Sequence, residues 1–296
     1  MGKQVSKPGV YRDIAMADYV ADPAPEPSLN ASCATTILTQ SPRHAWAQHP
    51  RLNPQPDHDE SSRLDLGTIA HGLLLEGDES KVVVIAADDW RKKEAKELRD
   101  AARADGKLPI LTKDYDGAHA MVIAARKAIA ETEIGADFAA AVPEQTLIWE
   151  EEGIWLRCRP DKATKDWRAV FDYKTCVGSA HPQVWSKSAL IRYGYDLQAA
   201  INLRGVEKLG KARRTTFVFV VQEIEAPYAV SLVSLTPRWL DLAEAKLKRA
   251  MSIWKGCIRT NEWPGYTGQI AYMEPPAYAE VGWDEYLPQI DAEDLI

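Results

Sequence analysis

Apolar residues recur at helical spacing along much of the chain. This spacing predicts helices over residues 34–48, 64–76, 92–104, 115–132, 182–191, 195–209 and 237–259. Shorter runs rich in Val, Ile, Trp and Phe, bounded by turn residues such as Glu152-Gly153, predict strands. These runs cover residues 145–150, 154–160, 169–174, 215–222 and 228–234. The first three strands are expected to follow one another as a meander.

The order of these elements predicts the fold class and the domains. We expect one α/β domain over residues 31–270, with a mixed sheet of about five strands flanked by helices and a helical N-terminal portion. Residues 1–30 are rich in Pro, Ala and Asp and are expected to form a flexible arm. Residues 271–296 contain several prolines and are expected to form an irregular tail.

Composition narrows the class of protein. The chain has 46% hydrophobic and 27% charged residues, which is ordinary for a globular protein. No apolar stretch reaches the roughly 18 residues of a membrane span, and the N-terminus lacks the apolar run of a secretory signal. Four scattered cysteines without a C-x-x-C pair suggest free thiols in a reducing compartment. We therefore expect a cytoplasmic protein that does not bind membranes.

The net charge of −7 argues against a uniformly basic protein that coats nucleic acid. It does not exclude an enzyme whose positive charge is confined to one channel. A bound metal ion can also supply local positive charge among acidic residues.

The chemistry-bearing residues lie on two of the predicted strands. Asp161 ends one strand, and Asp172 and Lys174 lie near the end of the next. Strand alternation places Asp172 and Lys174 on one face and turns Tyr173 away. Two carboxylates and an ammonium suit phosphodiester hydrolysis, because carboxylates hold Mg²⁺ or Mn²⁺ and a lysine stabilises developing charge. A surface Asp–Lys pair at a strand end gives the same D-x-K pattern, so on these residues alone both interpretations stay open.

Four longer stretches surround these residues. They are GTIAHGLLLEGDE (67–79), PEQTLIWEEEGIWLRCRPDKA (143–163), VFDYKTC (170–176) and YDLQAAINLRG (195–205). In this order and spacing they resemble the PD-(D/E)XK nuclease superfamily, and within it the RecE-type (exonuclease VIII) branch of phage recombination exonucleases. The resemblance covers residues 64–266 and implies a restriction-endonuclease-like core.

The resemblance implies a metal site. His71 matches a metal-ligating helix histidine, Asp161 and Asp172 match the two carboxylate ligands, and the backbone carbonyl of Tyr173 is a further ligand. The expected ion is Mg²⁺, for which Mn²⁺ substitutes. Some members of the superfamily carry an iron–sulfur cluster held by one early and three late cysteines. Here only Cys257 lies late, so no cluster is expected.

The resemblance also implies catalytic residues. Lys174 matches the catalytic lysine, and Glu144 matches an upstream glutamate that helps to hold a second metal or positions water. Gln198 matches a helix glutamine that contacts the lysine, water or a phosphate; an exposed polar residue on the helix is the alternative. Glu150, Glu151 and Glu152 fit better as the tip of a hairpin.

Arginines are the candidate DNA contacts, because a planar guanidinium suits phosphate. Arg43 in the stretch SPRHAW lies where this branch has a helix near the substrate, and is a candidate for binding a 5′-phosphate. Further candidates share only this chemistry: Arg157, Arg159, Arg192, Arg204, Arg213 and Arg214.

These residues lead to an expected function. The resemblance implies an exonuclease that degrades one strand of linear duplex DNA, 5′ to 3′, and leaves single strands for an annealing protein. It also implies a ring-shaped homo-oligomer whose basic residues face a central channel. Two alternatives stay open: a structure-specific or repair endonuclease of the same fold, and a non-catalytic DNA-binding scaffold.

Overall fold

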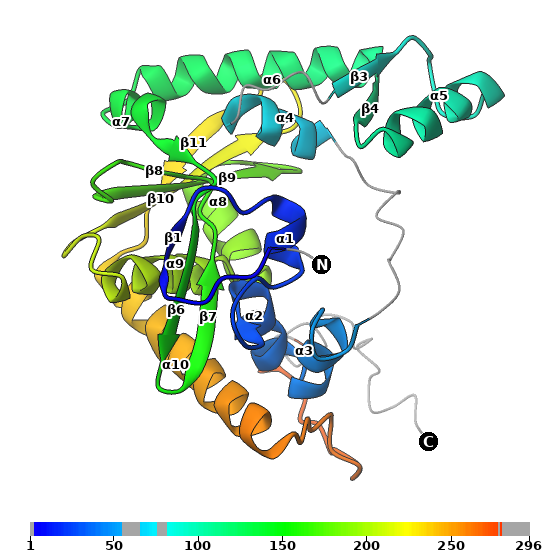
Figure 1. Ribbon diagram of the computed structural model, residues 1–296. Helices are drawn as coiled ribbons and strands as arrows, with labels where there is room; N and C mark the ends of the chain where they lie inside the picture. The colour runs from blue at the N-terminus through cyan, green and yellow to red at the C-terminus, as the bar shows by residue number, and fades with distance from the viewer. Residues whose placement is uncertain (1–2, 55–65, 76–81, 278, 280–296) are drawn as a thin grey trace, which may run out of the picture. The chain divides into compact units, whose positions relative to one another are not determined.

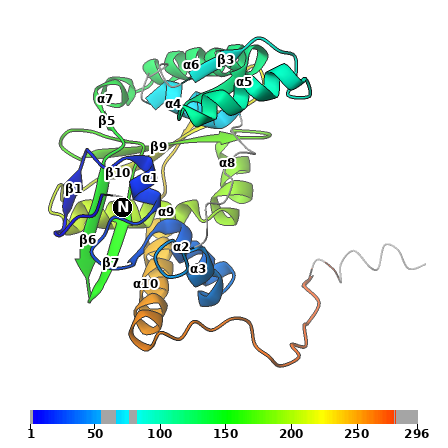
Figure 2. The same cartoon turned by 45° about the vertical axis from the view of Figure 1, so that its right-hand side comes forward.

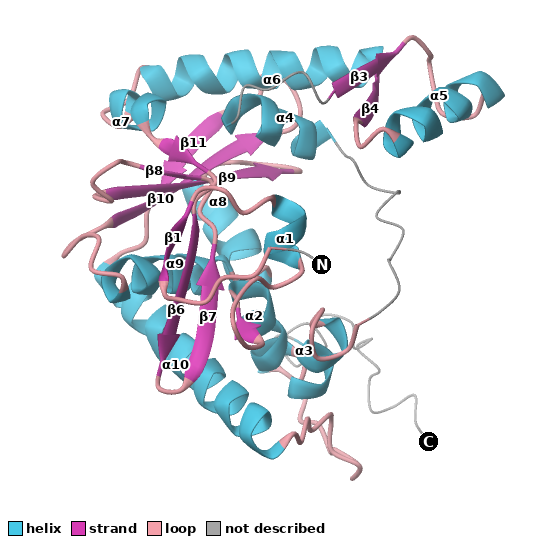
Figure 3. Ribbon diagram, viewed as in Figure 1, coloured by secondary structure: helices cyan, strands magenta, loops and turns pink. Residues whose placement is uncertain are grey.

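The fold is built on a mixed five-stranded sheet in the computed structural model, which describes residues 3–54, 66–75, 82–277 and 279 (Figures 1 and 3). In spatial order its strands are β11 (Val230–Val233), β10 (Thr216–Glu223), β9 (Ala169–Cys176), β8 (Lys162–Ala163) and β5 (Val142–Pro143). The β9–β10 pair is parallel and the other neighbours are antiparallel. The predicted α/β class with a mixed sheet is confirmed, and of the predicted strands β9, β10 and β11 lie in this sheet.

A second sheet contains four strands in the order β1 (Gly9–Tyr11), β6 (Thr146–Glu151), β7 (Ile154–Cys158) and β2 (Ser28–Leu29). The predicted hairpin between β6 and β7 is present, and Glu152 and Gly153 at its tip both have positive φ, 52° and 78°. The predicted three-strand meander is wrong, because β9 belongs to the other sheet. Pro160 lies two residues after the end of β7 and cannot donate to a ladder, and pairing resumes at β8.

Helices cover both faces of the five-stranded sheet (Figures 1 and 2). Phe171, Tyr173 and Val220 pack in one cluster with residues of α4 (Leu66–Leu75) and α6 (Thr112–Ala130). Val170, Phe219 and Val221 pack in a second cluster with α9 (Tyr195–Lys208) and α10 (Pro237–Thr260). Successive strand residues point to opposite faces, and this alternation forms both cores.

Two predicted helices are interrupted. The helix predicted over 34–48 is split into α2 (Ala31–Thr39) and α3 (Pro42–Gln48). Ser41 is the N-cap of α3, its hydroxyl accepts the His44 N–H at 3.4 Å, and Pro42 occupies the first turn. The helix predicted over 182–191 begins as α8 (Pro182–Trp185) and continues as a π-helical turn, η2 (Ser186–Leu190).

Other elements were not predicted. β3 (Val82–Ile85) and β4 (Leu108–Leu111) form a parallel pair joined through α5 (Lys93–Ala104), which was predicted. The remaining unpredicted helices are α1 (Met16–Val20) and α7 (Gly135–Ala140). No described helix is both long and apolar enough to cross a membrane.

The N-terminal segment differs from the expected flexible arm. Of its described residues, β1 pairs with β6, β2 pairs with β7, and Ile14 is buried. Residues up to Pro264 form one unit, and Gly265–Ile296 form a second, in which residues 265–276 contain no helix or strand. The rest of the expected tail, residues 280–296, lies outside the described residues.

A buried polar cluster attaches the N-terminal segment to the second sheet. The Asp22 carboxylate accepts hydrogen bonds from the Ser28 N–H at 2.8 Å and the Ser28 hydroxyl at 2.6 Å. It also lies 3.3 Å from Nε2 of His49 and 3.3 Å from the guanidinium of Arg157. Arg157 in turn donates to the Ser28 carbonyl at 2.7 Å. Asp22 therefore joins its own segment to His49 and Arg157, which lie much further along the chain.

We predict that this cluster makes stability depend on acidity. Burial raises the pKa of Asp22, but its hydrogen bonds with His49 and Ser28 and the Arg157 charge outweigh burial and hold the pKa below its usual value. The carboxylate therefore stabilises the fold above the pKa it has when unfolded, about 3.9, and this contribution is lost as the pH falls through the lower folded pKa. Urea unfolding should show wild type more stable than Asp22→Asn at neutral pH, with a gap that narrows below about pH 4. A constant gap would contradict the assignment.

Candidate active site

Three potential metal ligands come together beside the edge of the five-stranded sheet. They are His71 on α4, Glu144 between β5 and β6, and Asp161 directly before β8. One ligand atom from each lies within 4.8 Å of the other two. Two of the three were predicted as metal ligands, whereas Glu144 was predicted as a catalytic residue.

Asp161 is fixed by its neighbours. Its Oδ2 accepts the backbone N–H of Tyr173 at 2.7 Å and lies 3.1 Å from Nε2 of His71. Burial raises the pKa of this carboxyl, but the His71 hydrogen bond, the charges of His71 and Lys174, and the Tyr173 N–H outweigh burial and lower the pKa. Asp161 is therefore held as a carboxylate, the form that binds a cation. The expected convergence of Asp161 with the Asp172–Lys174 strand is present.

His71 reaches the site from the second turn of α4. Burial lowers the pKa of its imidazole, but the hydrogen bond with Asp161 and the charges of Asp161, Glu144 and Asp172 raise the pKa overall. The ring also lies 6.0 Å from the ring of Tyr173, centroid to centroid. A helix on one face of the sheet thus supplies one nitrogen to a group of carboxylates.

Glu144 sits in a strained turn, with φ of 57° in the left-handed region. Its backbone N–H donates to the Asp161 carbonyl at 3.0 Å, and its carboxylate pairs with the guanidinium of Arg159. Burial raises the pKa of Glu144, and the Arg159 contact opposes that effect without cancelling it. The turn and the arginine together aim Glu144 at Asp161 and His71.

Asp172 and Lys174 form a buried ion pair on the α9 side of β9. Asp172 is fully buried, and its Oδ1 accepts a hydrogen bond from Nε2 of Gln198 at 2.6 Å. Burial raises the pKa of Asp172 to about 6, against the lowering effect of the Lys174 charge. Burial lowers the pKa of Lys174, but the charges of Asp172 and Asp161 outweigh it and raise the pKa.

The predicted metal ligands therefore do not all lie together in the structure. Asp172 faces Lys174 and Gln198, and Glu144 takes its place beside His71 and Asp161. For Asp172 to bind an ion, one of its present contacts must give way. Gln198 contacts Asp172 rather than the lysine. The Tyr173 side chain points to the opposite face, as predicted, and its hydroxyl donates to Oε1 of Gln222 at 2.5 Å.

The cluster of three fits a divalent metal ion. Two ligands on opposite sides of Mg²⁺ are about 4.2 Å apart, given a metal–oxygen distance of about 2.1 Å, so the observed spread needs only small side-chain movements. Two carboxylates and an imidazole suit Mg²⁺ or Mn²⁺, since hard cations prefer oxygen and Mn²⁺ also accepts nitrogen.

The candidate DNA-binding arginines have different positions. Arg159 is mostly buried and also donates to the carbonyl of Ile14 at 2.7 Å, so it positions Glu144 rather than facing a substrate. Arg157 and Arg204 are likewise buried in ion pairs, with Asp22 and with Glu151. The exposed candidates are Arg43, Arg192, Arg213 and Arg214.

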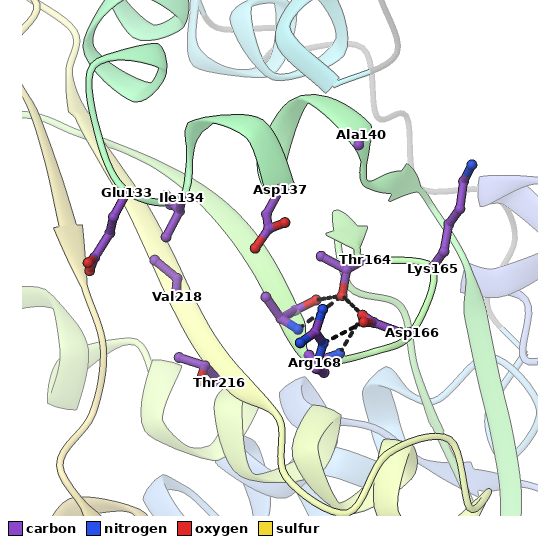
Figure 4. A pocket seen from close by; sticks show the side chains of 11 residues that line it. Glu133, Ile134, Asp137, Ala140, Thr164, Lys165, Asp166, Arg168, Thr216 and Val218 are labelled. Atoms are coloured by element: carbon purple, nitrogen blue, oxygen red, sulfur yellow. Dashed lines mark hydrogen bonds and ion pairs between the residues drawn. The ribbon is translucent and has the colours of Figure 1, made fainter.

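A separate cavity of about 530 Å³ lies near the other end of β9, where Ala169 begins the strand (Figure 4). Three of its polar residues interact with one another: Asp166 accepts from the Thr164 hydroxyl at 2.8 Å and from the backbone N–H of Arg168 at 3.2 Å. None of the predicted site residues lines this cavity.

Sequence similarity assigns the chain to a protein family. Residues 33–276 match the family described as a PDDEXK-like domain of unknown function (DUF3799). The chain belongs to this family. The predicted superfamily is thereby confirmed, and the RecE-type branch stays a prediction. The N-terminal strands β1 and β2 lie before the matched residues. No curated protein matches the sequence.

A solved structure shows the same fold. It is the crystal structure of a protein from Eubacterium rectale described as a candidate exonuclease, with a TM-score of 0.54 and 12% sequence identity. The similarity covers 95% of this chain and 98% of that chain. At this identity the likeness concerns the fold, and it agrees with the PDDEXK-like family and the restriction-endonuclease-like core.

The sequence did not predict that Arg159 positions Glu144, because Arg159 was predicted to contact DNA, and it did not single out Tyr195. Arg159 positions Glu144 only because of the turn at Glu144, and no local sequence pattern predicts that turn. Tyr195 has its ring 5.0 Å from Nζ of Lys174. Its position could have been found, because Tyr195 and Gln198 are three residues apart on one helix and so share a face.

Proposed function

We propose that the protein is a metal-dependent deoxyribonuclease that hydrolyses phosphodiester bonds at the ends of linear double-stranded DNA. The family and the fold support a nuclease. The observation that carries the proposal is the meeting of His71, Glu144 and Asp161 beside the buried Asp172–Lys174 pair. This arrangement argues against the alternative of a non-catalytic scaffold, since a scaffold has no need for a buried charged lysine beside a ligand cluster.

The metal would be held by His71, Asp161 and Glu144, with Asp172 as a further ligand if its contacts rearrange. When bound, Mg²⁺ polarises a phosphoryl oxygen and lowers the pKa of bound water, and Mn²⁺ is expected to substitute. The carbonyl of Tyr173 is proposed as an additional ligand, as the resemblance implies.

Lys174 supplies fixed positive charge. The charges of Asp172 and Asp161 raise its pKa, which keeps the ammonium protonated at neutral pH. An ammonium held in a buried position stabilises negative charge that develops on a phosphate better than one in water does. Asp172 orients the lysine, and Gln198 in turn orients Asp172.

Several finer properties rest on the resemblance to the RecE-type branch. They are 5′-to-3′ polarity, action in the cytoplasm, a ring-shaped homo-oligomer and supply of single strands to an annealing protein in recombination. The alternative within the same fold is a structure-specific or repair endonuclease. The described exposed arginines Arg43 and Arg192 are proposed to contact DNA.

Digestion of labelled DNA tests the proposal. With Mg²⁺, the purified protein is expected to release nucleotides from linear duplex labelled at either the 5′ or the 3′ end, and to leave closed-circular duplex intact. Chelation by EDTA should stop the reaction and Mn²⁺ should restore it. Asp161→Asn should be inactive because it weakens the ligand cluster, whereas the exposed control Asp166→Asn should match wild type.

Cleavage of closed circles would favour the endonuclease. DNA binding without any release of nucleotides would favour the scaffold. Full activity of Asp161→Asn would refute the site.

A further inference from the structure

A groove of about 580 Å³ begins where the strand that carries Lys174 ends. It is lined by Thr175 and Cys176 at the end of β9, by residues 177–179, by residues of α8 and η2, and by Arg192, Tyr193, Tyr195 and Ile224. Its size is in the range of pockets that hold small molecules. Of its lining residues, Tyr195 contacts Lys174 and Arg192 is one of the exposed candidate DNA-binding arginines.

The charge of this groove is opposite to that of the chain. Its lining residues include no Asp or Glu, and Arg192 is their one charged member. The whole chain carries a net charge of −7. Val177 and Val184 at its rim are 84% and 50% exposed, so the groove offers apolar surface next to one cation. A ligand with a flat apolar part and a negative group complements it.

A row of aromatic rings connects the groove to the catalytic lysine. Buried Trp185 stacks on Tyr195 with centroids 5.7 Å apart and planes 15° apart. Tyr195 contacts Lys174 and also lies 5.6 Å from the ring of Tyr193. Tyr193 is 56% exposed, and the guanidinium of Arg192 lies 5.7 Å from its ring centroid. The row therefore begins at buried Trp185 and ends at the exposed ring of Tyr193.

The backbone holds the two tyrosines in place. Gly194 between them has φ of 68°, and a Cβ there would lie 2.3 Å from Oγ1 of Thr35, so only glycine fits. Tyr193 and Tyr195 also line a second cavity of about 270 Å³ together with Gln198 and Arg159. Tyr193 therefore stands between the groove and the side of the active site.

We propose that this groove binds an unpaired nucleotide of the DNA strand next to the bond that is cut, with its base stacked on Tyr193 and its backbone phosphate paired with Arg192. The proposal rests on the proposed nuclease function and specifies its substrate as a strand separated from its complement. Aromatic stacking with a basic contact is the usual means of binding single strands without sequence preference. A base inside a duplex has both faces covered by its neighbours, whereas an unpaired base can place a face on Tyr193.

Binding in EDTA, where no cleavage occurs, tests the proposal. The probes are a fluorescein-labelled oligothymidylate and an abasic oligomer of equal length, which has the phosphates without the bases. By fluorescence anisotropy, Tyr193→Ala should bind oligothymidylate about tenfold more weakly than wild type, because stacking on one ring contributes about that much. Its affinity for the abasic oligomer should be unchanged, and Tyr193→Phe should match wild type on both.

Arg192→Ala separates the phosphate contact from the stacking. It should weaken binding of both oligomers. It should also reduce the slope of log affinity against log salt concentration by about 1, the change expected for the loss of one phosphate contact. The matched control is Arg168→Ala, an exposed arginine of the separate cavity, which should bind like wild type. Three results would overturn the proposal. Tyr193→Ala could bind oligothymidylate as tightly as wild type, it could lose as much affinity for the abasic oligomer as for oligothymidylate, or wild type could fail to bind either.

The outcome does not depend on hydrolysis. A protein that binds as expected and releases no nucleotides with Mg²⁺ would refute the proposed function and leave the groove assignment standing. A protein that digests DNA, with Tyr193→Ala as tight a binder as wild type, would refute the groove alone.

Discussion

Replacing Lys174 by alanine is expected to lower the rate of Mg²⁺-dependent DNA hydrolysis by about 10³-fold, the usual loss when one buried group that stabilises transition-state charge is removed. The variant should still fold. Without the lysine charge the pKa of Asp172, already raised by burial, rises further, so this carboxyl becomes neutral and keeps its hydrogen bond with Gln198. Single-turnover digestion of linear duplex measures the rate, and circular dichroism checks the fold.

Two controls sharpen this test. Lys165→Ala removes an exposed lysine that lines the separate cavity and should match wild type. The double variant Lys174→Ala with Asp172→Asn removes the charge of both partners and should be as inactive as Lys174→Ala while folding well. Retention of most of the activity by Lys174→Ala would show that the lysine is structural.

Replacing Arg157 by alanine is expected to destabilise the fold by about 3–5 kcal/mol, because it leaves the buried Asp22 carboxylate without its cationic partner. Arg157 is 2% exposed and donates to both the carbonyl and the hydroxyl of Ser28 at 2.7 Å. These bonds attach the N-terminal segment to β7. Urea unfolding with a common m-value measures the loss.

The exposed Arg168 provides the matched control. It is 80% exposed and pairs with Asp166 on the surface, so Arg168→Ala should cost less than about 1 kcal/mol. Combining Arg157→Ala with Asp22→Asn should cost less than the sum of the single losses, because the two groups interact directly. A loss below about 1 kcal/mol in Arg157→Ala would mean that the N-terminal segment is only loosely attached, as its composition suggested.

Local patterns predicted much of the fold correctly. The periods of helix and strand are set by backbone geometry, so the apolar spacing located α9, α10, β9 and β10 within a few residues. The same period placed Asp172 and Lys174 on one face and turned Tyr173 to the other. The prediction failed where an element is short, as in β1, β2 and β8, because two or three residues carry no period.

The sequence by itself determined the longer helices and strands and the placement of Asp172 and Lys174 on one face, because each depends on residues near one another in the chain. It also determined the superfamily, through the order and spacing of four short stretches. Only the tertiary structure decided that Glu144 joins His71 and Asp161, that Arg159 positions Glu144, and that the N-terminal segment is packed. These contacts join residues far apart in sequence: Arg157 and Ser28 are separated by 129 positions. Such contacts form only when the long-range packing of the sheets brings their partners together, so no local spacing of residues predicts them.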